Sequence, residues 1–268
     1  MYWTHVARKD FADAVRSKMF WALSVIMILL AFIGMYIPRA IEDDPDVSTG
    51  ITILGSVIVF LIPIIGLIVG YMSVVGERQR GSIRMLLSLP LRRSEVFFGK
   101  FVGRSIVLAV PIVIGFALAV PFVLVIYGEA PGIEYLEFVT RALLTGIVYV
   151  AVAVGISGSV DTRGKALAGV VGIYFLFEQF WSAIPLAIYW VINRELPGLN
   201  DRPAWFEFIT QIDPTVAVSE TVSALFDLSI STDRALITQE WVTALLVILW
   251  IAVPLGLGYL RFKQANIS

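Results

Sequence analysis

ITILGSVIVFLIPIIGLIVGYMSVV, residues Ile51–Val75, contains no charged side chain. A helix needs roughly 20 mainly apolar residues to cross the hydrocarbon core of a bilayer, and this stretch is longer than that. Pro63 is compatible with such a helix, because neighbouring helices satisfy the backbone groups that a proline leaves free. The stretch therefore predicts a transmembrane helix.

The composition of the whole chain also indicates a membrane protein. Hydrophobic residues make up 58% of the 268 positions and charged residues 15%, whereas soluble domains have about 25% charged residues. We predict an all-α, polytopic membrane protein with six transmembrane helices, organised as a single transmembrane domain over residues 1–268. The predicted spans are Phe20–Ile37, Ile51–Val75, Ile106–Tyr127, Ala142–Val160, Ala168–Ile192 and Val242–Leu260.

Charged residues are divided unequally between the two sets of segments that flank these spans. The N-terminus, residues 76–105, residues 161–165 and the C-terminal tail hold 15 Lys and Arg and 5 acidic residues. Residues 38–50, 128–141 and 193–241 hold 5 Lys and Arg and 15 acidic residues. Because cytoplasmic loops carry an excess of Lys and Arg, we predict a multi-pass cell-membrane protein with both termini cytoplasmic and an extracellular segment at 193–241.

The residues before the first span have the pattern of an amphipathic helix. Trp3, Phe11 and Met19 belong to a set of apolar residues at helical spacing, and charged residues such as Arg8 and Asp13 fall largely on the other side. We predict a helix that lies in the cytoplasmic membrane interface. An ordinary soluble arm is the alternative.

The sequence offers little for a catalytic centre, a metal site or a cofactor. It contains no cysteine, and its one histidine, His5, lies outside the predicted spans. The motif Gly155-Ile156-Ser157-Gly158 superficially resembles that of an intramembrane serine protease, but no membrane-embedded histidine is available as a base. Close helix packing by small residues explains this motif better. Gly99-Lys100 and Gly164-Lys165 lack the other residues of a phosphate-binding loop, so any ATP hydrolysis requires a separate subunit.

A dense block of cations follows the second predicted span. Residues Gly76–Arg104 read GERQRGSIRMLLSLPLRRSEVFFGKFVGR, with seven Lys and Arg and two Glu. A short apolar helical face stops at Pro90, and a second helix, capped by Ser94, leads into the third span. A signal for membrane topology would explain the charges but not this broken helix. We therefore interpret the segment as a docking element for a cytoplasmic partner.

Motif residues in this segment resemble the loop of ABC-2 type transporter permeases. The matching positions are Gly76-Glu77-Arg78-x-x-Gly81-Ser82, Leu86-Leu87-Ser88-Leu89-Pro90, Arg93 and Gly99-Lys100. The likeness is to the NosY-like group in particular, including its members from halophilic archaea, and it extends over nearly the whole chain. It implies that residues 1–19 form a connecting helix and that residues 76–105 contain the coupling helix that docks on an ATPase.

The resemblance further implies a transporter subunit that is not itself an enzyme. Its expected partners are a cytoplasmic ABC ATPase subunit, a second permease copy or paralogue, and membrane lipid, with no nucleic acid. The expected activity is export driven by ATP hydrolysis on the separate subunit. A non-transporting membrane scaffold that anchors a cytoplasmic partner through the same loop is the alternative. The residues predicted to contact the ATPase are Glu77, Arg78, Gly81, Arg84, Arg92 and Arg93.

Glu178 is the only acidic residue inside a predicted span. It lies roughly 15 Å along the fifth span, near the midplane, where a charge costs at least about 2.5–3.5 kcal/mol. Tyr174, Glu178 and Ser182 share one face of a regular helix. These residues are either a polar element of the transport path or gate, or an interhelical hydrogen bond at a subunit contact.

The long acidic segment 193–241 contains one clear helix start. Asp213-Pro214 is typical of an N-cap followed by a proline at the first helical position. In the family that the chain resembles, this region forms short helices that cap the outer end of the pathway. A surface helix with no role in gating is the alternative.

Overall fold

The structure is a computed structural model that describes residues 3–41, 46–80, 92–198, 202–226 and 239–264. These residues form helices and contain no strand. The helices are α1 (Trp3–Val15), α2 (Lys18–Ile41), α3 (Val47–Gly70), α4 (Val75–Arg80), α6 (Arg93–Tyr127), α7 (Ile133–Ser159), α8 (Arg163–Tyr174), the π-helix η1 (Phe175–Phe180), α9 (Ala183–Asn193), α10 (Ala204–Gln211), α11 (Pro214–Phe226) and α12 (Glu240–Gln264).

Five helical segments within the described residues are long and apolar enough to cross a membrane. They are α2, α3 continued through α4, α6, α7 and α12. The fifth predicted span, Ala168–Ile192, falls on α8, η1 and α9, which meet the same criteria only as a pair bent by 49°. The structure therefore confirms an all-α, multi-pass fold, with five candidate spans, or six if the bent pair is one span.

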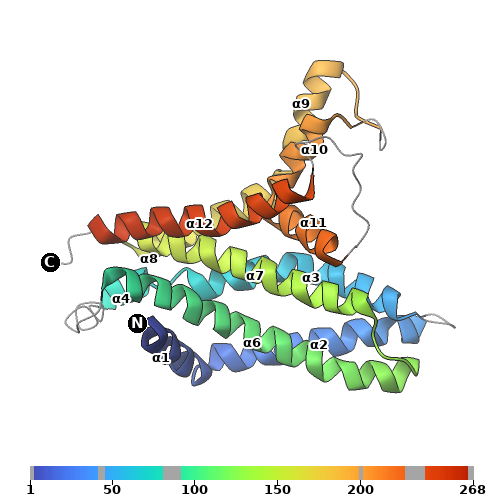
Figure 1. Ribbon diagram of the computed structural model, residues 1–268, viewed down its shortest axis with the longest axis horizontal. Helices are drawn as coiled ribbons and strands as arrows, with labels where there is room; N and C mark the ends of the chain where they lie inside the picture. Colours follow the sequence, from blue (N-terminus) through green and yellow to red (C-terminus); the bar gives the residue numbers. More distant parts are fainter. Residues whose placement is uncertain (1–2, 42–45, 81–91, 199–201, 227–238, 265–268) are drawn as a thin grey trace.

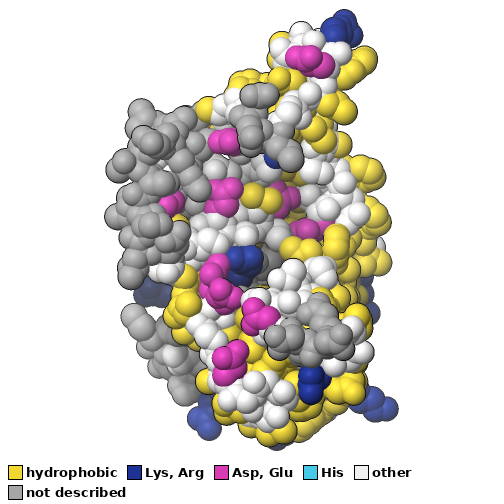
Figure 2. All heavy atoms as spheres, turned by 90° about the vertical axis from the view of Figure 1, so that its right-hand side faces the viewer, with side chains coloured by type: hydrophobic (Ala, Val, Ile, Leu, Met, Phe, Trp, Pro, Cys, Tyr) yellow, Lys and Arg dark blue, Asp and Glu magenta, His cyan; other side chains and the backbone are white. Residues whose placement is uncertain are grey.

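The bundle has two distinct ends (Figure 1). The described parts of the N- and C-terminus, α4 and the start of α6 lie at one end, which we name the terminal end. The end of α2, the start of α3 and the α6–α7 connection lie at the opposite, distal end, and α9 and α10 project away from the bundle. Figure 2 shows acidic side chains distributed over the distal end.

Helix α7 lies at the centre of the bundle and packs against α3, α6, α11 and α12. Every residue from Val148 to Val154 is buried. A Cβ atom on Gly155 would lie 2.3 Å from the carbonyl oxygen of Pro254, so α7 and α12 cross with their backbones in contact. Ser157 accepts hydrogen bonds from backbone N–H groups at the α3–α4 junction. This geometry confirms the packing explanation of the small-residue motif.

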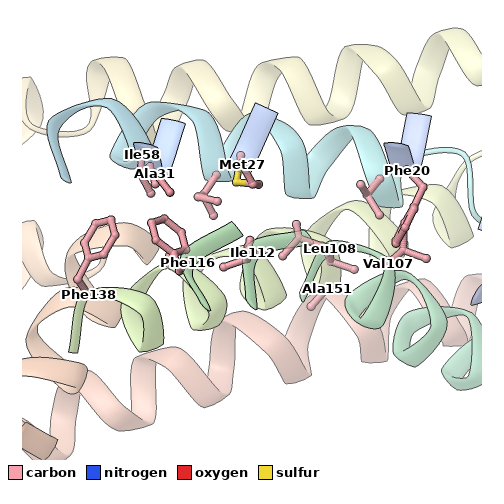
Figure 3. Packing of buried hydrophobic residues seen from close by; sticks show 14 of the residues in the cluster. Phe20, Met27, Ala31, Ile58, Val107, Leu108, Ile112, Phe116, Phe138 and Ala151 are labelled. Atoms are coloured by element: carbon pink, nitrogen blue, oxygen red, sulfur yellow. The ribbon is translucent and has the colours of Figure 1, made fainter. Parts of the chain in front are cut away.

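Helices α2 and α6 pack through apolar side chains (Figure 3). Met27 and Ala31 of α2 are buried opposite Ile112 and Phe116 of α6. Phe116 also makes an edge contact with Phe138 of α7, with ring centroids 5.2 Å apart and an interplanar angle of 83°. Since lipid tails are as apolar as these side chains, it is their close fit that favours this packing over lipid contact.

The N-terminal helix α1 packs along α6. Ala7 and Ala14 are buried in this contact, while Arg8, Lys9 and Asp13 are exposed. The predicted amphipathic helix is thus present, and its location in the membrane interface stays a prediction.

Candidate functional site

Four charged side chains from three helices meet at the terminal end. Lys100 of α6 has a side chain only 2% exposed, and its Nζ lies 2.5 Å from Oε1 of Glu77 in α4 and 3.5 Å from Oδ1 of Asp10 in α1. One turn further along α6, Nε of Arg104 lies 2.9 Å from Oδ2 of Asp10. We name these residues the charge cluster. Its two cations and two carboxylates balance, as buried charges require.

A break after α3 places Glu77 in this cluster. The chain leaves α3 at Gly70, forms a turn, and starts α4 at Val75. The backbone N–H groups of Val74 and Val75 donate to Oγ of Ser157 at 3.1 Å, which satisfies donors that the break would otherwise leave free. The hydroxyl of α7 thereby fixes the position from which α4 reaches Lys100.

The other side of the predicted coupling loop is the start of α6. The helix begins at Arg93, and the Glu95 carboxylate accepts the backbone N–H of Arg92 at 3.1 Å. The prediction that Ser94 caps this helix is therefore wrong, because Ser94 already lies inside its first turn. A carboxylate in the first turn also interacts favourably with the helix dipole.

A second polar site surrounds Glu178 at the bend between α8 and α9. Glu178 belongs to the π-helix, and its Oε1 accepts hydrogen bonds from the hydroxyl of Tyr149 in α7 and from Oγ1 of Thr215 in α11, the latter at 2.5 Å. π-Helical turns occur frequently at functional sites. The carboxyl group thus joins the bent pair to two other helices of the same chain.

Asp213 fixes the start of α11 next to this carboxyl group. Its Oδ1 accepts the backbone N–H groups of Thr215 at 2.8 Å and Val216 at 3.1 Å, and Pro214 is the first helical residue, as predicted. Burial raises the pKa of Asp213 to about 7, and the nearby charge of Glu178 acts in the same direction. Two carboxyl groups therefore lie close together at the junction of α11 with the bent pair.

Two indole groups hold the α10–α11 junction. Nε1 of Trp181, at the bend, donates to the carbonyl of Ile209 at 2.7 Å. Nε1 of Trp250, in α12, donates to the carbonyl of Ile212 at 2.8 Å. The junction is thereby tied both to the bent pair and to the bundle.

Comparison with known proteins places this architecture in a family. Residues 4–267 match the profile described as ABC-2 family transporter protein. The chain belongs to the ABC-2 transporter family. It is 28% identical over 275 residues to the probable ABC transporter permease protein NosY of Stutzerimonas stutzeri, with 97% of each chain covered. It is 31% identical over 193 residues to the protein of the same name from Pseudomonas aeruginosa, covering 69% of this chain and 70% of that one.

The predicted resemblance to ABC-2 permeases of the NosY-like group is thus confirmed, and this permease is the membrane subunit of an ABC transporter. Among its predicted ATPase contacts, Arg78 is directed to the permease itself. Nη1 of Arg78 donates to the carbonyl of Val160 at 2.9 Å and lies 3.3 Å from Oδ1 of Asp161, and the guanidinium lies 5.9 Å from the ring centre of Phe262. Arg78 therefore connects α4 to the terminal ends of α7 and α12.

The remaining predicted contact residues are distributed differently. Arg93 donates to the carbonyl of Lys263 at 2.7 Å, and Glu77 is part of the charge cluster. Arg92 is exposed. Gly81 and Arg84 lie outside the described residues.

The predicted face of Tyr174, Glu178 and Ser182 is interrupted by the π-helix, whose repeat is wider than that of an α-helix. Tyr174 lines an apolar groove of about 490 Å³ between α3 and α8, together with residues such as Leu67 and Tyr71. Ser182 is exposed at the bend. The polar neighbours of Glu178 come instead from α7 and α11.

Sequence reasoning missed three of the four residues of the charge cluster. Asp10 follows Ala7 by three residues and precedes Ala14 by four, so it interrupts the small-residue stripe that faces α6. Lys100 and Arg104 are four residues apart, just before the third predicted span and within the first turns of α6. Asp10 is an acid on an otherwise apolar helix face, and Lys100 and Arg104 are two cations on one face of another helix. These were the signals of a buried ionic contact.

Proposed function

We propose that this permease exports its substrate and receives the driving force from a separate cytoplasmic ABC ATPase through residues 76–105. The observation that carries the proposal is the buried pair of Lys100 and Glu77. Glu77 lies in the helix before residues 81–91 and Lys100 in the helix after them, so one ion pair joins both sides of the segment. A displacement of residues 81–91 by the ATPase acts on both helices together.

Helix α6 is suited to carry this displacement across the protein. It is 35 residues long and runs from the terminal end to the distal end. It packs against α1, α2 and α7, and α1 is fastened to it by Asp10 through Lys100 and Arg104. Movement of its first turns is therefore transmitted to the connecting helix and to the centre of the bundle.

We further propose that the terminal end faces the cytoplasm and that residues 193–241 lie outside the cell. Both described chain ends lie at the terminal end, as expected if the bent pair is a sixth span. The distal end carries acidic side chains, whereas the segments assigned to the terminal end hold most of the Lys and Arg residues. The charge distribution thus supports the orientation.

The membrane-facing surface supports contact with lipid and with a second permease. Trp21, Val25, Leu29 and Ile33 of α2 recur every four residues, and each is more than half exposed, which suits contact with acyl chains. The bent pair buries little of its surface, since η1 has no buried residue, α9 has only Pro185, and α8 has only Ala166 and Val170. We propose that this pair faces a second permease copy or paralogue, and that Tyr174, Glu178 and Ser182 belong to the transport path or its gate.

Reconstitution with the ATPase tests this function. The permease is co-expressed with a candidate ABC ATPase subunit from the same organism, and co-purification, ATP hydrolysis and transport across a substrate panel are measured in proteoliposomes. We expect co-purification and ATP-dependent movement of a substrate out of the compartment on the terminal side. A stable complex that moves no substrate and leaves ATP hydrolysis unchanged favours the scaffold alternative.

A further inference from the structure

A small cavity lies in the distal half of the bundle, between α3, α7 and α11. Its volume is about 130 Å³. Apolar residues of α3 and α7 form part of its wall, and four polar side chains complete it, namely Arg141, Thr145, Thr215 and Ser219. Water occupies about 30 Å³ per molecule in the liquid and needs two to four polar partners. The cavity therefore has room and hydrogen-bonding groups for a few water molecules.

Thr215 connects this cavity to Glu178. It lines the cavity, and its Oγ1 donates to Oε1 of Glu178 at 2.5 Å. The hydroxyl of Tyr149 bonds to the same carboxylate oxygen and lies 3.4 Å from Oγ1 of Thr215. The hydroxyl group of Thr215 therefore links the cavity to the carboxyl group of Glu178.

Arg141 connects the cavity to the distal solution. Its side chain is 38% exposed, and its Nη2 lies 2.6 Å from Oε1 of Glu137 and 3.1 Å from Oγ of Ser223. Glu137 neutralises Arg141, so this entrance carries no net charge that would exclude a proton. A row of polar groups therefore runs from the distal surface to Glu178.

The other titratable groups that face Glu178 are Tyr149 from α7 and Asp213 from the residue before α11. Within the described residues, neither Glu178 nor Asp213 forms an ion pair with Lys or Arg. Among the groups that the structure describes, only hydroxyl and backbone donors bond to these two carboxyl groups. A proton is therefore the available counter-charge for a carboxylate at this position.

We propose that the cavity is a water-filled route from the distal solution to Glu178, and that Glu178 is a proton-binding site whose ionised form fastens α11 to the bent pair. Hydrogen bonds that a carboxylate accepts are charge-assisted and roughly twice as strong as neutral ones. Protonation weakens the bonds from Thr215 and Tyr149 together, because both end on the same oxygen. Acidification of the distal solution thus loosens α11 from the bend.

Carbodiimide modification tests the site directly, without the ATPase or a transport substrate. Dicyclohexylcarbodiimide reacts with protonated carboxyl groups in apolar surroundings, and mass spectrometry locates the product. The full-length permease is reconstituted in vesicles with a different pH on each side. Glu129→Cys, on the exposed α6–α7 connection of this cysteine-free chain, reports the orientation by reaction with an impermeant maleimide.

We expect modification of Glu178 to increase severalfold as the distal solution is acidified. The yield should not depend on the pH of the solution at the terminal end. Gly55→Leu fills the cavity, because Gly55 lines it and a Cβ atom there meets no other atom within 4 Å. This variant should lose the dependence on distal pH. Gly256→Leu is the matched control, since Gly256 of α12 also has open space and lies outside the cavity lining. Ser219→Met serves as a second filling variant.

Three results overturn the proposal. The first is modification of Glu178 that follows the pH of the terminal side. The second is modification that is absent, or equal at acidic and alkaline distal pH. The third is a dependence on distal pH that persists in correctly folded Gly55→Leu and Ser219→Met. Asp213→Asn is measured in parallel, so that the product at Glu178 is not confused with one at Asp213.

Discussion

Nζ of Lys100 lies 2.5 Å from Oε1 of Glu77, and this ion pair connects the two helices on either side of residues 81–91. Lys100 is nearly inaccessible to solvent, so the pair is not an ordinary surface contact. It lies where movement of a docked partner would enter the bundle. Its loss should therefore affect both the stability of the permease and its response to the ATPase.

Lys100→Met should destabilise the permease by about 3–5 kcal/mol, because it leaves the charge cluster with one cation for two carboxylates. Lys100→Met combined with Glu77→Gln should restore part of this loss. Lys165→Met is the control. The side chain of Lys165 is 66% exposed, and its Nζ lies as far as 3.9 Å from Oδ2 of Asp161, so this surface contact is expected to contribute about 0–1 kcal/mol. Thermal unfolding in detergent measures all of them, and equal destabilisation by Lys100→Met and Lys165→Met would contradict the assignment.

Arg92→Lys should weaken binding of the ATPase while membrane insertion stays normal. Insertion depends on the sum of cations, which lysine preserves, whereas a docking contact depends on the planar, forked donors of arginine. Arg93→Lys should instead loosen the contact between α6 and the end of α12, because Arg93 donates to the carbonyl of Lys263. Pull-down of the ATPase and protease sensitivity of the C-terminus separate the two effects. If neither Lys variant changes either measurement, these residues act in topology alone.

Glu178→Gln should be tolerated better than Glu178→Lys. The amide oxygen of glutamine can still accept hydrogen bonds from Tyr149 and Thr215, whereas an ammonium group accepts none. The yield of monodisperse protein after extraction measures the difference, and parental behaviour of the lysine variant would show that Glu178 faces bulk water.

Asp213→Asn should stabilise the permease at alkaline pH and have little effect at acidic pH. The folded-state pKa of Asp213 is raised from 3.8 to about 7, so the folded protein holds a proton that the unfolded chain releases, and stability falls as pH rises through this interval. Asparagine removes this dependence and remains a good N-cap. The difference in melting temperature between the variant and the parent should grow from pH 4 to about pH 7. A constant difference would show that Asp213 keeps its ordinary pKa.

Cysteine labelling should place the two ends of the bundle on opposite sides of the membrane. The chain has no native cysteine, so single replacements report one position each. In intact cells, an impermeant maleimide should label Glu129→Cys at the distal end and spare Lys165→Cys at the terminal end. Both positions are exposed, so burial does not explain a missing signal. The reverse pattern would invert the proposed orientation.

The spans and the start of α11 were predictable because their signals are local. A run of apolar residues predicts a membrane helix wherever it packs, and Asp213-Pro214 combines two capping preferences in adjacent positions. The bend at Glu178 was not predictable, since the π-helix is accompanied by hydrogen bonds to Tyr149 and Thr215, which lie in other helices. The assumption of a regular helical repeat consequently placed Tyr174 and Ser182 beside Glu178, although neither residue bonds to it in the described structure.

The charge cluster was only partly accessible to sequence analysis. Glu77 was identified from its position after the second span and from the resemblance to ABC-2 permeases. Its actual partner, Lys100, is 23 residues away, and Asp10 is 94 residues from Arg104. Which acid meets which cation depends on how α1 and α4 pack against α6. Pattern alone therefore did not predict the internal ion pair of Glu77, whereas its contact with the ATPase stays a prediction.

The order of the charge cluster along the chain bears on how the permease is made. Asp10 and Glu77 precede Lys100 and Arg104 in the sequence, so the ribosome releases both carboxylates before either cation. When α6 emerges, both of the acids that pair with Lys100 have already been synthesised. A change that removes either acid should therefore lower the yield of inserted protein even when no ATPase is present.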